Sequence, residues 1–114
     1  MKAFLVESHN AAPEIREVAV PEPNKGEIRV RIHACGLNFA DLLMVKGTYQ
    51  DTPGLPFALG MEVSGTVDAL GEEVEGFALG DRVAVFGGQG GLAEYGCFDA
   101  RRAVHLPDAM SMVD

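Results

Sequence analysis

The chain has 114 residues, a formal net charge of −8 and 47% hydrophobic residues, which corresponds to a single globular domain. Its 17 acidic side chains against 9 basic ones argue against nucleic acid as a partner, because such binding depends on neutralising phosphates. The same balance argues against binding to anionic membrane surfaces. The 14 glycines exceed the roughly 8 expected from an average usage of about 7%, which indicates many turns.

The N-terminal segment carries one positive charge, at Lys2, and a short apolar run that ends at Glu7. That run is too short for a signal peptide or a membrane span, so the segment is predicted to be a first strand. Cys35 and Cys97 lie far apart without a Cys-x-x-Cys pair. This spacing allows a disulfide, but without an export signal it favours reduced thiols. We therefore expect a cytoplasmic protein.

Most of the chain is predicted to form β-strands. Residues 27–34 and 62–70 alternate apolar and polar side chains with a period of two, which is typical of half-buried strands. Residues 82–86 form a β-branched run after a Gly-Asp turn signal, and the alternation returns over 93–98. Strands separated by short turns in this way favour an all-β barrel or sandwich.

One short helix of about two turns is predicted to begin after Asn38, a residue type that caps helix N-termini well. Asp41 falls at the third helical position, where a carboxylate stabilises the exposed amides of the first turn. Gly47 suits the C-terminal cap. We therefore interpret Asp41 as a helix-capping residue rather than a catalytic one.

The C-terminus has the spacing of a second helix start, with Ser111 as the cap and Asp114 three residues later. A helix of one turn does not form alone, because nucleation is costly. We therefore expect that the chain has been cut where a second element or domain begins. A frayed polar tail is the alternative.

An ordered series of short motifs resembles the N-terminal GroES-like domain of the medium-chain dehydrogenase/reductase superfamily, and within it the zinc-free quinone oxidoreductase branch. The motifs include Cys-Gly-Leu-Asn-Phe-Ala-Asp, Gly-Met-Glu and Gly-Asp-Arg-Val. In chain order they occupy residues 35–41, 46–49, 55–57, 60–65, 71, 80–83, 93–95 and 106–108. The resemblance covers nearly the whole chain.

This resemblance implies a mainly β, partly open GroES-like barrel with one short helix over residues 1–114. It further implies that the C-terminal Rossmann domain, which binds most of NADP(H), is absent from the chain. The expected function is the N-terminal, substrate-side domain of a zinc-independent, NADPH-dependent oxidoreductase of quinones or other conjugated carbonyls. The complete protein would be a homodimer acting on a small-molecule quinone or enone. The chain alone would be inactive.

The residues at the zinc positions of the superfamily indicate that no metal is bound. Zinc-dependent relatives place a Cys at the position of Asn38 and a His at that of Met61, and an amide and a thioether are poor zinc ligands. Glu62 alone cannot hold a metal. Those relatives also carry a four-cysteine lobe between the positions of Val83 and Ala93, where this chain has a short glycine-rich segment.

Asn38 and Tyr49 are the candidate site residues, and no metal ligand is predicted. The resemblance places Asn38 near the nicotinamide, where its amide can donate and accept hydrogen bonds; helix capping is the other interpretation. Tyr49 matches a tyrosine that lines the cofactor cleft and is the proposed proton donor of related enoyl thioester reductases. A phenol with a pKa of about 10 can deliver a proton after hydride transfer. A structural tyrosine at the rim is the alternative.

Two further segments have structural interpretations. Residues 87–91 lack the spacing of a phosphate-binding loop and are predicted to be a hairpin connection beside the cleft. Arg82 is expected to pair with Glu62.

Two other functions stay open. An enoyl thioester reductase is supported by the Tyr49 match, and a stand-alone β-barrel binding module or co-chaperonin-like oligomer is a non-enzymatic alternative.

Overall fold

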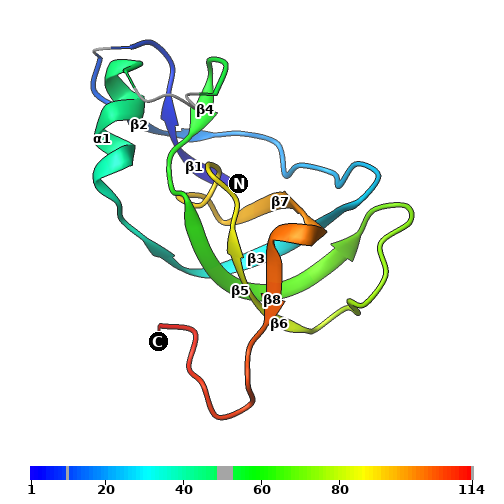
Figure 1. The fold of residues 1–114 in the computed structure, drawn as a ribbon. Helices are drawn as coiled ribbons and strands as arrows, with labels where there is room; N and C mark the ends of the chain where they lie inside the picture. The colour runs from blue at the N-terminus through cyan, green and yellow to red at the C-terminus, as the bar shows by residue number, and fades with distance from the viewer. Residues whose placement is uncertain (10, 49–52, 114) are drawn as a thin grey trace.

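The computed structural model describes residues 1–9, 11–48 and 53–113. Strands dominate and a single α-helix follows the third of them, which confirms the predicted mainly β fold (Figure 1). The elements are β1 (Lys2–Val6), β2 (Glu14–Glu17), β3 (Glu27–Gly36), α1 (Phe39–Lys46), β4 (Phe57–Ala58), β5 (Glu62–Leu70), β6 (Arg82–Phe86), β7 (Tyr95–Asp99), the 3₁₀-helix η1 (Ala100–Arg102) and β8 (Ala103–His105).

The strands form two antiparallel sheets, one in the order β2-β1-β4 and the other in the order β7-β3-β5-β6-β8. Within the larger sheet β5 lies between β3 and β6, and Glu62 stands opposite Phe86. The segment before β7 joins the two sheets, because the amide of Phe4 donates to the carbonyl of Leu92 at 2.8 Å. The sheets curve around a common interior without closing into a full barrel, as the partly open barrel requires.

The buried side chains of the main core come from alternating apolar positions of β3, β5, β6 and β7, all in the larger sheet. These side chains are Ile28, Val30, Val63, Val67, Val83, Val85 and Phe98. A second cluster packs α1 against the smaller sheet through Met44, which is fully buried with Val6, Phe57, Leu59 and Met61. Burying one such side chain contributes roughly 1.5–3 kcal/mol, so Met44 anchors the helix.

Helix α1 begins and ends where the sequence predicts. Asn38 has an extended backbone (φ −127°, ψ 152°), and Gly47 ends the helix in the left-handed region at φ 73°. Glycine adopts that conformation without a steric penalty. No helix in the described part of the chain is long and apolar enough to cross a membrane.

Residues 106–113 form turns, and Figure 1 shows this segment at the opposite end of the molecule from α1. The amide of Val113 donates to the hydroxyl of Ser111 at 3.3 Å, as at a helix start, but Asp114 lies outside the described residues, so the predicted helix start stays a prediction. The guanidinium of Arg82 donates to the carbonyls of Pro107 at 3.2 Å, of Asp108 at 3.4 Å and of Met110. The hydroxyl of Ser64 donates to the carbonyl of a later residue in the segment, Met112. These two side chains hold the segment against β5 and β6.

The predicted pairing of Arg82 with Glu62 is therefore wrong. Arg82 stands opposite Thr66 on β5, four residues beyond Glu62, and strand residues rise by about 3.3 Å each. The guanidinium instead satisfies carbonyl groups of the C-terminal segment.

Replacing Arg82 with methionine should release residues 106–113. Amide hydrogen exchange followed by mass spectrometry should show faster exchange in this segment, while the core strands keep their protection. The free energy of unfolding should fall by no more than about 1 kcal/mol, because the lost contacts are solvent-exposed. Arg101→Met, which removes an exposed guanidinium paired with Asp99, is the matched control. Unchanged exchange over 106–113 in Arg82→Met would contradict the assignment.

Candidate functional site

The carboxylate of Asp41 joins two distant parts of the chain. Asp41 is only 7% exposed; its Oδ2 accepts a hydrogen bond from the amide of Asn38 at 3.0 Å, and its Oδ1 accepts one from the amide of Gly60 at 3.3 Å. A buried carboxylate needs such partners, because burying an unpaired charge is costly. Asp41 therefore caps α1, as predicted, and also fixes the turn that carries Met61 and Glu62 into β5.

Asn38 forms a reciprocal capping box with Asp41 at the start of α1. N-capping uses an oxygen acceptor, so the amide nitrogen is left over. Nδ2 of Asn38 is buried and has no hydrogen-bond partner among the described residues. Leaving such a donor unsatisfied costs about 1–3 kcal/mol, and an acceptor on a ligand would remove that cost. Capping and cofactor binding are therefore compatible roles for Asn38.

Asn38 lies on a mostly apolar groove of about 650 Å³ that runs along α1. Leu37, Phe39 and Leu42 border it, and their exposed fractions are 76%, 75% and 60%. Exposed apolar side chains gathered in one place mark a surface that other groups cover.

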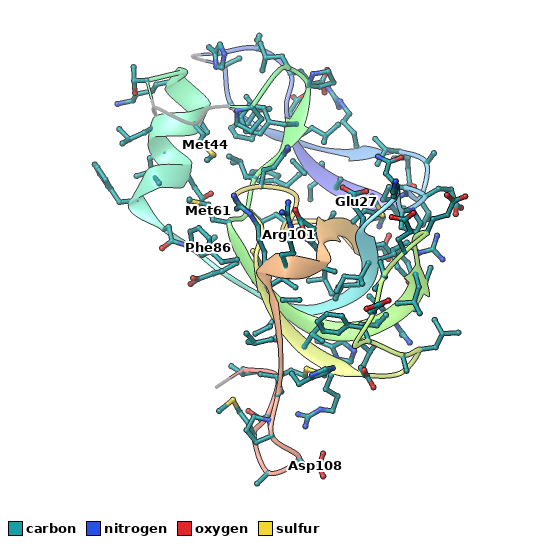
Figure 2. All side chains as sticks on the ribbon, turned by 45° about the vertical axis from the view of Figure 1, so that its right-hand side comes forward. Glu27, Met44, Met61, Phe86, Arg101 and Asp108 are labelled. Atoms are coloured by element: carbon teal, nitrogen blue, oxygen red, sulfur yellow. The ribbon has the colours of Figure 1, made fainter. Side chains whose placement is uncertain are left out.

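A second hollow, which we name the Met61 pocket, has a volume of about 450 Å³. Figure 2 shows Met44, Met61 and Phe86 on the same side of the molecule, between α1 and β6. The pocket is lined by Met44, Pro53, Met61, Phe86, Gly87, Gly88, Gln89 and Arg102. Its volume lies within the range of small-molecule sites, about 300–1,000 Å³. The resemblance gives Met61 the position of a zinc-ligating histidine, although Asn38, at the expected position of a cysteine ligand, lines the other groove.

The glycine-rich connection 87–91 forms one wall of this pocket. The amides of Gly87 and Gly88 both donate to the carbonyl of Met61, at 2.8 and 3.1 Å. Gly88 and Gly90 have φ values of 85° and 89°, which other residues adopt only under strain. The segment links β6 to β7, but β3 and β5 lie between these strands in the sheet, so the predicted hairpin is wrong. The amides bound to Met61 are not available to a phosphate.

The structure brings some of the predicted site residues together and not others. Through Asp41 it links Asn38 to Met61, although the two side chains line different hollows. Tyr49 lies outside the described residues, so its place in the cleft stays a prediction. Among the described residues no three His, Cys, Asp or Glu side chains gather closely enough to hold a metal ion, and the expected absence of zinc stays a prediction as well.

Sequence reasoning missed Arg102. In the sequence Arg101 and Arg102 are equivalent neighbours, and only the geometry of η1 separates them. Arg101 forms an ion pair with Asp99 at 2.7 Å, whereas Arg102 donates to the carbonyl of Phe86 at 3.3 Å and lines the Met61 pocket. The signal in the sequence was Asp99, which ends β7 and is a residue type that caps helices. Its side chain caps η1.

Both cysteines are free thiols with weak reactivity. Partial burial, helped by the negative charges of Asp41 and Glu62, raises the pKa of the Cys35 thiol to about 11. Partial burial also raises the pKa of Cys97 to about 11, with a further contribution from Glu27. The thiolate is the nucleophilic form, so about one molecule in ten thousand is reactive at pH 7 at each site.

Alkylation by iodoacetamide should therefore be slow at neutral pH and rise about tenfold for each pH unit between pH 7 and pH 9. A thiol in an unfolded peptide, with a pKa of about 8.5, would already level off at the upper end of this range. The rates can be followed by mass spectrometry of the intact chain, with the urea-unfolded chain as the reference. A plateau below pH 9 in the folded chain would contradict the raised pKa values.

Removing the Asp41 carboxylate should destabilise the fold. Asp41→Ala leaves the amides of Asn38 and Gly60 without acceptors and should lower the free energy of unfolding by about 2–4 kcal/mol. Asp41→Asn keeps one oxygen acceptor and should cost about half as much. Urea denaturation monitored by circular dichroism measures both, and Asp108→Ala on the exposed C-terminal segment should change stability by less than about 0.5 kcal/mol. Equal effects of Asp41→Ala and Asp108→Ala would refute this role.

Comparison with known proteins finds oxidoreductases among the relatives of this chain. Quinone oxidoreductase of Pseudomonas aeruginosa is 44% identical over 98 residues, which cover 85% of this chain and 30% of that protein. Synaptic vesicle membrane protein VAT-1 homolog-like of Mus musculus is 43% identical over 93 residues, or 82% of this chain and 22% of that protein. The quinone oxidoreductase of Thermus thermophilus, whose structure is known alone and in complex with NADPH, has a TM-score of 0.82 at 36% identity and covers 98% of this chain and 34% of its own.

The chain spans less than a third of the length of the first two relatives. The relatives and structural neighbours confirm the resemblance to quinone oxidoreductases of the medium-chain dehydrogenase/reductase superfamily. Residues 24–108 match the alcohol dehydrogenase GroES-like domain, and because that match covers most of the chain, the chain belongs to this domain family.

Proposed function

We propose that residues 1–114 are the N-terminal, substrate-side domain of a zinc-independent, NADPH-dependent oxidoreductase that reduces quinones or other conjugated carbonyls. The dinucleotide-binding domain would lie outside these residues. The observation that carries the proposal is the chemistry at two linked positions: an amide at Asn38 and a thioether at Met61 stand where zinc-dependent relatives have metal ligands. The similarity to proteins named quinone oxidoreductase supports the substrate class.

One observation on this domain supports NADP(H) binding: the side-chain amide nitrogen of Asn38 is buried and has no hydrogen-bond partner among the described residues. The buried Nδ2 donor would hydrogen-bond an oxygen of the carboxamide or ribose, and this contact would orient the nicotinamide face. When bound, the cofactor supplies the hydride. With a net charge of −8 this domain repels an anionic cofactor, so the phosphates would be bound elsewhere.

The residues of the Met61 pocket would shape and shield the acceptor. Met44, Met61 and Phe86 give it apolar walls that suit a planar conjugated ring and keep water away from it. Without a metal, negative charge that develops on the acceptor oxygen must be met by hydrogen-bond donors and then by a proton. Tyr49 is the proposed proton donor from this domain.

The reduction of an enoyl thioester is the second candidate function, favoured by the match at Tyr49. A quinone that has accepted a hydride carries its charge on oxygen and takes its proton from water, whereas an enoyl thioester must be protonated at carbon. A positioned acid is therefore needed for the thioester and dispensable for the quinone. We further propose, on the resemblance alone, that the complete protein is a cytoplasmic homodimer.

A chimera tests the proposal and separates the two substrates. Residues 1–114 replace the matching part of the Pseudomonas aeruginosa quinone oxidoreductase, and NADPH oxidation is measured with a quinone and with an enoyl thioester. We expect quinone reduction, with no zinc found by elemental analysis after dialysis. Tyr49→Phe should leave kcat for the quinone within a few-fold and lower kcat for a thioester by about 10²–10⁴-fold.

A folded chimera that binds NADPH but reduces neither substrate would refute the enzymatic function and favour a binding module. Stoichiometric zinc that resists a chelator would refute the zinc-independent mechanism. The same change at Tyr95, a tyrosine on β7, is the matched control and should not change the ratio of the two activities.

A further inference from the structure

The Met61 pocket contains one feature that its apolar walls do not explain, the guanidinium of Arg102. We infer that Arg102 binds an anionic oxygen of the acceptor, so that the pocket prefers conjugated acceptors that carry a carboxylate, a sulfonate or a similar anionic group. This inference rests on the proposed function, because it identifies the class of acceptor that the same pocket would take.

The head of the side chain, and not only its aliphatic stem, lies at the pocket wall. Nη1 of Arg102 donates to the carbonyl of Phe86 at 3.3 Å. A Cβ added at Gly88 would lie 3.6 Å from the same nitrogen. Phe86 and Gly88 both line the Met61 pocket. The guanidinium is therefore held over the start of the glycine-rich connection, and four of its five N–H donors are left for other partners.

Arg102 also forms no ion pair with the described residues, although its charge acts on the carboxylate of Asp99, which is paired with Arg101. Arg16, Arg29 and Arg101 form ion pairs with carboxylates, whereas Arg102 forms none with the residues that the structure describes. The other residues that line the Met61 pocket carry no charge. Glu62 borders the neighbouring hollow that Arg102 also reaches, but its carboxylate lies over Gly36. An exposed, unpaired guanidinium at the edge of an apolar pocket is a typical site for an oxyanion.

The charge of the whole chain makes this local cation decisive. At a net charge of −8, the long-range field disfavours any anionic ligand. An anionic acceptor would therefore bind more weakly than its neutral analogue unless a cation at the pocket reversed the order. A preference for the anionic analogue would be a specific property of Arg102 and could not arise from the average charge of the domain.

Two anthraquinones test the inference on the 114-residue chain, because an anthraquinone lacks the open enone that would alkylate the thiols. Anthraquinone-2-sulfonate is the anionic probe and 2-(hydroxymethyl)anthraquinone is the neutral one. Titrations followed by ¹H–¹⁵N spectra report binding at the amides of Gly87 and Gly88. We expect the wild-type chain to bind the sulfonate about three- to fivefold more tightly, which is the range of an exposed ion pair.

Arg102→Met should abolish or reverse this preference while the affinity for the neutral probe stays within about twofold. Arg102→Lys keeps the charge but loses the planar fork, so it should restore part of the preference. Arg101→Met is the matched control and should keep the preference in full. Raising the ionic strength from about 0.05 M to about 0.5 M should reduce the preference for the sulfonate in the wild-type chain, whereas in Arg102→Met it should only weaken the repulsion of the sulfonate by the net negative charge.

Arg102 could bind either an anionic group of the acceptor or a phosphate of the cofactor. A titration with inorganic pyrophosphate distinguishes these two ligands. Shifts at Gly88 that depend on Arg102 and match those of the sulfonate would assign the guanidinium to phosphate binding and overturn the inference. If both anthraquinones bind equally to the wild-type and Arg102→Met chains, the inference fails and the proposed function stands. If neither shifts Gly87 or Gly88, the Met61 pocket is not an acceptor site, and the proposed function fails with the inference.

Discussion

The carboxylate of Asp41 joins the start of α1 to the turn before β5. It accepts hydrogen bonds from the amides of Asn38 and Gly60, and it is buried where water cannot replace those bonds. Because Gly60 precedes Met61, the same contact sets the distance between the helix and the Met61 pocket. The carbonyl of Met61 in turn receives two amides from the glycine-rich connection. Helix, strand and loop therefore share one hydrogen-bonded path, and the orphaned amide of Asn38 lies at its beginning.

Patterns within ten residues predicted most of this framework. The period-two alternation located β3, β5 and β7, a β-branched run after a turn signal located β6, and residues 38, 41 and 47 located α1. The physical causes of these elements are local. Strands β2, β4 and β8 were not predicted. β2 is exposed along its length, and β4 and β8 have two and three residues, so their pairing depends on partners far away in the chain.

The long-range roles of single side chains were the part that the sequence could not supply. The Gly-Asp-Arg-Val run predicts that Arg82 lies on a strand. The register that places Arg82 opposite Thr66 is set by pairing with β5. Arg101 and Arg102 are adjacent and chemically identical, and only η1 turns one toward Asp99 and the other toward Phe86. For Asp41 the capping role was predicted, whereas the bond to Gly60 spans 19 residues and leaves no trace in local spacing.

The loss of metal ligands and the presence of an unpaired cation are connected by the same electrostatic requirement. A zinc ion in this position would polarise a carbonyl oxygen and meet the charge that develops there. In the proposed reductase, an amide and a thioether at Asn38 and Met61 would leave that charge to fixed hydrogen-bond donors. The described pocket has apolar side chains at Met44, Met61 and Phe86, the polar glycine-rich connection beside them, and the guanidinium of Arg102 at its edge. An edge position suits a substituent of the acceptor better than the reacting carbonyl, which would lie deeper, near Met61. On our proposal Arg102 would discriminate between acceptors, and the donor to the reacting oxygen would come from another group.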